Sequence, residues 1–154
     1  MLRLRQVLLQ TPPMLMAVPA VLGADVTINT GGGALTIAKV SGVGGTVDSC
    51  SSAGNCTVGN YGLTITNGAG AVSIAGAVGA TKSLTSLSIT GSGTSALGGS
   101  VTTSGAQSYT GAVTLGGNTT LTTTDSNVTF SSTVNGTTAA THGQRSPRRH
   151  RPRR

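Results

Sequence analysis

The side chains that could do acid–base chemistry are few and far apart in this 154-residue chain. The acids are Asp25, Asp48 and Asp125, and the two histidines, His142 and His150, lie near the C-terminus. Proton transfer, and the cleavage of glycosidic bonds in particular, requires two such groups held close together. Intervals of 23 and 77 residues between the acids favour separate positions in solvated loops. We therefore predict no catalytic activity, and a polysaccharide-acting β-helix enzyme is the disfavoured alternative.

Cys50 and Cys56 flank the segment SSAGN, which has the composition of a turn. In an exported protein this spacing predicts a disulfide, which for so short a ring contributes about 2 kcal/mol. Two free thiols are the alternative. A zinc site needs more ligands than two cysteines and the distant His142 and His150 supply, so we expect no metal.

The segment GSGTSA at 91–96 matches the Gly-x-Gly-x-x-Gly/Ala pattern of nucleotide-binding loops and follows a predicted strand, LSIT. That pattern indicates a nucleotide site only where a helix follows and an acidic residue lies about 20 positions further on. Neither is found in the sequence here. The segment is interpreted as a turn, and we expect no cofactor.

The basic charge of the chain lies at its two ends. The formal net charge is +7, yet residues 25–141 hold Lys39 and Lys82 against the three aspartates, a net charge of −1. Six arginines fall between positions 145 and 154, and we expect residues 142–154 to form a disordered Arg/Pro-rich tail. Such a tail binds phosphates through charge alone, because no aromatic side chain interleaves it to stack a base. We expect no specific nucleic-acid partner.

Residues 1–24 have several features of an export signal. Arg3 and Arg5 give a positive start, residues 14–22 are apolar, and Pro12 and Pro13 interrupt the apolar region. A mis-started or out-of-frame leader is the alternative. The abrupt change to Arg and Pro after about residue 143 likewise favours a frameshifted or truncated product. On that hypothesis the chain is a fragment of a longer repeat protein.

Short strands must position the residues between 25 and 141, since one pattern recurs there: an apolar residue, Thr or Ser, a second apolar residue and then a turn-former. Alternation of this kind predicts strands with one buried face, and no sustained 3.6-residue stripe predicts a helix. The pattern occurs at 26–28, 35–37, 63–65, 72–74, 87–89, 113–115 and 128–130.

The intervals between these triads recur. Triads start nine residues apart at 26 and 35 and at 63 and 72, and fifteen apart at 72 and 87 and at 113 and 128. Recurring intervals favour a coil whose turns stack, with small aliphatic side chains filling a narrow core. The sequence predicts an all-β fold, a parallel β-helix (β-solenoid) of about five rungs over residues 25–141 with disordered N- and C-terminal ends. A β-sandwich is the alternative.

Residues 63–136, which include LTITNGAGAVSIAGAVGAT, SVTTSGAQSYTGAVTLGGNTTL and NVTFSSTVNG, resemble the repeat regions of filamentous-haemagglutinin and autotransporter adhesins. The passengers of those bacterial surface proteins are right-handed parallel β-helices. The resemblance implies an exported stalk or adhesin that needs no cofactor. It carries over no catalytic residue.

We therefore expect a structural or adhesive module of a secreted or cell-surface bacterial exoprotein. Its partners would be glycans or proteins of host or neighbouring cells, bound weakly and many times over. Exposed hydroxyls at Thr120, Thr122 and Thr124 are the candidate glycan contacts. An ice- or crystal-binding solenoid is an alternative, for which this segment is the nearest match to a Thr-x-Thr repeat. Unpaired solenoid ends predict self-association.

Overall fold

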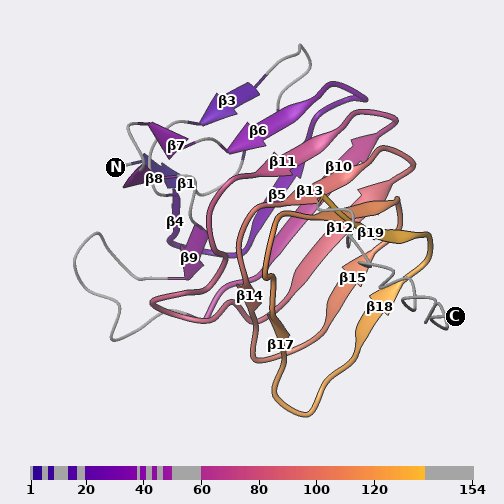
Figure 1. Cartoon of the computed structure of the whole chain (residues 1–154). Coiled ribbons are helices and arrows are strands. Elements are labelled where there is room, and N and C mark those ends of the chain that lie inside the picture. Colours follow the sequence, from indigo (N-terminus) through magenta and orange to yellow (C-terminus); the bar gives the residue numbers. More distant parts are fainter. Residues whose placement is uncertain are drawn as a thin grey trace, which may run out of the picture.

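The protein is a parallel β-helix, seen in a computed structural model as stacked coils (Figure 1). Side chains are described for residues 22–37, 47–49 and 60–137, and the backbone alone for 2–4, 7–8, 14–16, 20–21, 39–40 and 43–44. Within these ranges every strand pair is parallel except one. The described part of the chain contains no helix long and apolar enough to cross a membrane.

Each coil contributes strands to three sides. The first side, called here the β10 sheet, runs in the order β2 (Val7–Leu8), β5 (Val26–Asn29), β10 (Leu63–Gly68), β12 (Leu87–Gly91), β15 (Gln107–Tyr109) and β18 (Val128–Phe130). The second, the β11 sheet, runs β3 (Met14–Met16), β6 (Leu35–Ile37), β11 (Val72–Ile74), β13 (Ser95–Leu97), β16 (Val113–Leu115) and β19 (Val134–Gly136).

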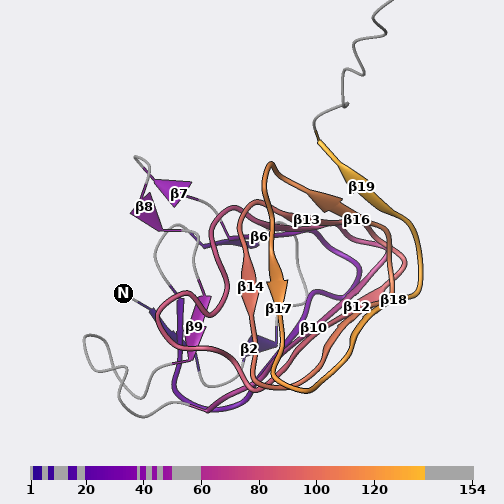
Figure 2. The ribbon, with the colours of Figure 1, turned by 60° about the horizontal axis from the view of Figure 1, so that its bottom comes forward.

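The third side, called the β9 side, is less regular. It holds β1 (Leu2–Leu4), β4 (Ala20–Leu22) and β9 (Val47–Ser49), followed by β14 (Val101–Thr102) and β17 (Leu121–Thr122). Val78 joins the two groups through parallel bridges to Val47 and Val101. An antiparallel hairpin, β7 (Lys39–Val40) with β8 (Val43–Gly44), is inserted between β6 and β9. In Figure 2 the coils overlap, and the three sides enclose the interior.

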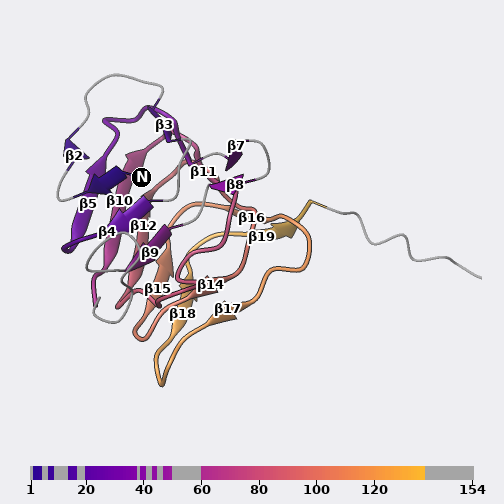
Figure 3. The same ribbon diagram turned by 90° about the vertical axis from the view of Figure 1, so that its left-hand side faces the viewer.

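Residues of successive coils stack in register. Leu63 pairs with Leu87, Leu87 with Gln107, and Gln107 with Val128, so these coils are 24, 20 and 21 residues long. Figure 3 shows the coils following one another from β5 to β18. The predicted parallel β-helix is confirmed, and five coils of the β10 sheet, from β5 to β18, fall within residues 25–141 as expected. The β-sandwich alternative is excluded, because the main sheets are parallel.

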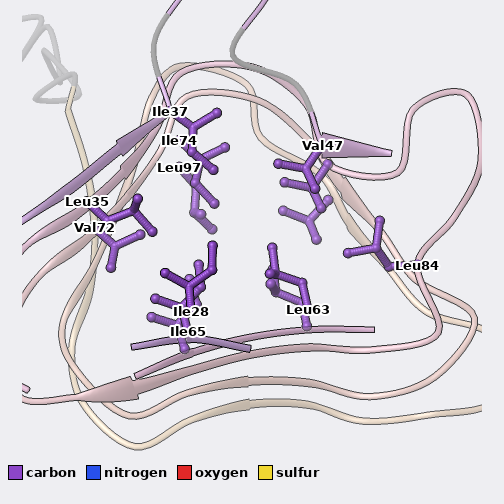
Figure 4. Close-up of a cluster of buried hydrophobic side chains, with 14 of the residues drawn as sticks. Ile28, Leu35, Ile37, Val47, Leu63, Ile65, Val72, Ile74, Leu84 and Leu97 are labelled. Carbon is purple, nitrogen blue, oxygen red and sulfur yellow. The ribbon is translucent and has the colours of Figure 1, made fainter. Parts of the chain in front are cut away.

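Stacked aliphatic side chains form the core, because every second residue of a strand points inward. Ile28, Ile65 and Ile89 form one ladder, and all three are at most 2% exposed. A second ladder, of Ile37, Ile74 and Leu97, lines the opposite wall (Figure 4). Each inward position of a strand thus stacks on the same position of the next coil, and these ladders fill the interior, as the alternating triads predict.

Glycines stack where the chain turns from the β10 sheet into the β11 sheet. A Cβ atom at Gly70, Gly93 or Gly111 would collide with the carbonyl oxygen of the glycine one coil earlier, which for Gly70 is Gly33. Only a residue without a side chain allows the coils to approach this closely. The column of glycines therefore sets the coil spacing at this corner.

The N-terminal end differs from the expectation of disorder. The backbone of β1 pairs with β4, β2 with β5 and β3 with β6, all in parallel. Residues within the predicted leader, 1–24, thus add a coil to the stack. The predicted C-terminal tail, 142–154, lies outside the described residues.

Candidate binding surface

Two of the three aspartates predicted to lie apart, Asp25 and Asp48, form hydrogen bonds to the following coil. Asp25 accepts a hydrogen bond from the backbone N–H of Gly62 at 2.8 Å. Asp48, in β9, accepts from the N–H groups of Thr81 at 2.8 Å and Lys82 at 3.3 Å. These carboxylates therefore satisfy backbone donors of the following coil, which is a structural role.

Asp125 lies in the turn between β17 and β18, with a left-handed φ of 50°. Aspartate tolerates this conformation better than most residues. No three His, Cys, Asp or Glu side chains gather as a possible metal site within the described ranges. The predicted disulfide partners, Cys50 and Cys56, lie outside those ranges, as do His142 and His150.

The predicted glycan contacts lie around β17. Thr120, Thr122 and Thr124 are exposed, as the prediction requires. The neighbouring coil offers matching outward hydroxyls at Ser100 and Thr102, and the Ser100 hydroxyl accepts a hydrogen bond from the Thr120 N–H at 3.1 Å. One coil further back the chain has Ala77 and Gly79 on either side of Val78. The hydroxyl array on the β9 side thus extends over two coils.

A longer array covers the outer side of the β10 sheet. The middle residues of its strands point away from the core and pair with one another from coil to coil: Thr27 with Thr64, Thr64 with Ser88, Ser88 with Ser108, and Ser108 with Thr129. All are exposed or half-buried. This file of hydroxyls runs unbroken over five coils.

A second file lies two residues further along each strand. Asn29 pairs with Thr66, and Thr66 with Thr90. Thr110 and Ser131 continue the file, because their N–H groups donate to the carbonyls of Ile89 and Tyr109 one coil earlier, at 3.0 and 2.9 Å. We call the two files together the hydroxyl face, which consists of Thr27, Asn29, Thr64, Thr66, Ser88, Thr90, Ser108, Thr110, Thr129 and Ser131.

The hydroxyl face carries no ionisable group at any of its ten positions. The other two sides are mixed. The corresponding middle positions of the β11 sheet hold Thr36, Ser73, Ala96, Thr114 and Asn135, so Ala96 interrupts that polar file, and the β9 side includes the carboxylate of Asp48. Among the residues whose side chains the structure describes, only the β10 sheet presents a hydrogen-bonding, uncharged side chain at both outward positions of five successive coils.

The geometry of the strands makes the hydroxyl face a two-dimensional array. Successive coils lie about 4.8 Å apart, and two residues of a strand span about 6.6 to 6.8 Å. Each hydroxyl can donate one hydrogen bond and accept two. At β12 the hydroxyl oxygens of Ser88 and Thr90 are 3.4 Å apart, which is close enough for a hydrogen bond between the two files. The array can bind a ligand through many weak, uncharged contacts.

Sequence reasoning missed this face because residues that are neighbours in one file, on successive coils, lie 20 to 37 positions apart in the chain. The signal was present in the residue that follows each triad: VTIN, LTIT, LSIT, QSYT and VTFS all place a polar side chain second and fourth. Aligning these five segments on their triads would have shown that the second residues form one file and the fourth residues form the other.

The fold and this surface define a parallel β-helix with one uncharged, hydroxyl-lined side. Comparisons of the chain with protein-family profiles, with curated proteins and with solved structures find no match.

Proposed function

We propose that this chain is a non-catalytic structural and adhesive module of a secreted or cell-surface protein, and that the hydroxyl face is its contact surface. The observation that carries the proposal is the register of ten uncharged polar side chains over five coils. The partners are surface glycans or proteins of neighbouring cells, as the resemblance to adhesin repeats implies.

Weak hydrogen bonds suffice for adhesion because the coils hold the hydroxyl groups rigidly. A single hydrogen bond exchanged with water contributes only about 0.5 to 1.5 kcal/mol. The backbone of each strand in the face is paired on both sides from β5 to β15, so little conformational freedom is lost when several hydroxyls bind together. Avidity then grows with the number of coils in contact.

The absence of charge on the hydroxyl face predicts how binding depends on salt concentration. Ionic contacts weaken as salt screens them, whereas hydrogen bonds between neutral groups depend little on ionic strength. Neutral residues can also stack from coil to coil without the repulsion that like charges experience. We expect adhesion through this face to persist at high salt.

The test compares two triple variants for binding to insoluble polysaccharides and to bacterial and host cells. One, Thr64→Val, Thr66→Val and Thr90→Val, removes three hydroxyls from the hydroxyl face. The control, Thr36→Val, Ser73→Val and Thr114→Val, makes the matching change on the β11 sheet. Valine suits strands, so both should fold.

We expect the first variant to bind about tenfold more weakly or worse, because each lost hydrogen bond contributes about 0.5 to 1.5 kcal/mol. The control should bind like the unmodified protein. No binding of the unmodified protein to any of these surfaces, or equal loss in both variants, contradicts the proposal.

A further inference from the structure

We propose that the hydroxyl face binds an ordered water lattice, that is, the surface of ice. This inference rests on the proposed function in one respect, that the hydroxyl face is the contact surface. It goes beyond the adhesive function by naming a second ligand, a repeating solid, for the same surface.

Regular spacing in two directions is the first reason. The coils repeat every 4.8 Å or so, and the backbone positions of the two files lie about 6.6 to 6.8 Å apart along each strand. At β12 the hydroxyl oxygens of Ser88 and Thr90 approach to 3.4 Å. Pairing is one residue to one residue through Thr27, Thr64, Ser88, Ser108 and Thr129, without a bulge in this file. A crystal of water presents hydrogen-bonding oxygens in regular rows, so a rigid array can engage many of them at once.

The second reason is the chemistry of the side chains. Six of the ten positions are Thr, whose hydroxyl donates and accepts hydrogen bonds while its methyl group is apolar. Such a side chain can join an ordered water network through its oxygen, and it offers no charge that would organise water differently. Ionised side chains are strongly hydrated and would disturb the lattice.

The hydroxyl face contains no aromatic side chain, which fits a ligand that offers only hydrogen-bonding groups. The rings of the β10 sheet, Tyr109 and Phe130, lie at inward positions, where they stack on each other. An aromatic ring offers a large, rigid, amphipathic contact surface for binding. The hydroxyl face has none at its ten positions, whereas a water lattice needs only donors and acceptors.

The third reason is that folding alone does not require polar side chains at all ten of these outward positions. A parallel β-helix needs aliphatic residues only at inward positions, and the three sides share that requirement. The β11 sheet accepts Ala96 at an outward position, and the β9 side accepts Asp48. The uniform polar character of the hydroxyl face therefore points to a ligand that contacts all five coils.

The experiment measures the partition of protein into slowly growing ice, together with inhibition of ice recrystallisation. The variant Thr64→Tyr places a bulky ring within the hydroxyl face, between Thr27 and Ser88 of the neighbouring coils. The control, Thr114→Tyr, places the same ring at the middle outward position of β16. Tyrosine is favoured in strands, and circular dichroism of each protein checks that it is folded.

We expect the unmodified protein and Thr114→Tyr to be enriched in the ice fraction. Thr64→Tyr should lose about tenfold or more of that enrichment, because the ring holds neighbouring hydroxyls beyond hydrogen-bonding distance of a flat surface. Exclusion of the unmodified protein from ice overturns the inference, as does equal enrichment of Thr64→Tyr.

The unmodified protein separates this inference from the adhesive function. Its partition into ice and its binding to polysaccharides and cells are measured independently, and the two results are compared. Polysaccharide binding with exclusion from ice leaves the adhesive function and removes the inference. Enrichment in ice without binding to polysaccharides or cells supports the inference and contradicts the adhesive function.

Discussion

The ring of Tyr109 stacks on the ring of Phe130 in the following coil, with centroids 5.1 Å apart and planes inclined by 13°. The Tyr109 hydroxyl, fully buried, donates to Gln107 Oε1 at 3.0 Å. Gln107 Nε2 in turn donates to the Thr122 carbonyl at 2.9 Å and to the Thr103 hydroxyl at 3.2 Å. A polar network thus replaces the aliphatic ladder at β15 and links the β10 sheet to the β9 side.

Replacing one member of this network should destabilise the protein more than replacing two. In Gln107→Leu the Tyr109 hydroxyl remains buried without its acceptor, which costs about 1 to 3 kcal/mol. In Gln107→Leu with Tyr109→Phe no such donor remains, and the ring stack on Phe130 is kept. We expect the double variant to recover most of the loss in urea unfolding. A double variant less stable than the single one would contradict this account.

Stability should fall at alkaline pH because of Tyr109. Burial raises the pKa of its phenol above the ordinary value of 10.0, since the buried site disfavours the phenolate. The unfolded phenol therefore ionises first, and the stabilisation is complete below about pH 10 and decreases above it, by up to about 1.4 kcal/mol per pH unit. Unfolding free energies of Tyr109→Phe and of the unmodified protein should have the same slope below pH 10 and diverge above it. Parallel curves throughout would refute the assignment.

Gly93→Ala should be strongly destabilising, because its Cβ would collide with the carbonyl oxygen of Gly70 in the preceding coil. The coils would have to separate locally, and overpacking of this kind costs about 1 to 3 kcal/mol. Gly117 provides the control: its φ is 73°, and a Cβ there would meet nothing within 4 Å. Gly117→Asn should cost little, because asparagine tolerates this conformation. Melting temperatures of the two variants test the difference.

Asp48→Ala should destabilise the stack by about 1 kcal/mol, because the N–H groups of Thr81 and Lys82 lose their shared acceptor. Asp125→Asn serves as the comparison at an exposed turn, where asparagine tolerates the left-handed φ, and it should leave stability unchanged within about 0.5 kcal/mol. Denaturant midpoints measured side by side check both values. An equal effect at the two sites would show that Asp48 has no special structural role.

The alternating triads were sufficient to predict the fold. All seven form strands, and the two recurring intervals have a structural meaning: nine residues separate two sides of one coil, as from Val26 to Leu35, and fifteen lead from Val72 on the β11 sheet to Leu87 of the next coil. Strands β13 and β15 were missed because their inward residues include Ser95 and Gln107, which interrupt the apolar pattern.

The candidate surface was harder to predict than the fold. Hydroxyls at Thr120, Thr122 and Thr124 attracted attention because they are close in sequence, whereas the hydroxyl face brings together residues as distant as Thr27 and Thr129. Register across coils decides which side chains are neighbours, and coil length varies with insertions such as the β7–β8 hairpin. A single sequence indicates the strands but not how they align.

The hydrogen bonds between coils run along the axis of the stack, since the strands lie across it. Tension applied to the two ends therefore acts on these bonds directly and peels coils from an end one after another. Each coil of 20 to 24 residues, once detached, would release roughly 70 to 85 Å of extended chain. A tether built in this way lengthens in steps and absorbs a sudden load before it breaks.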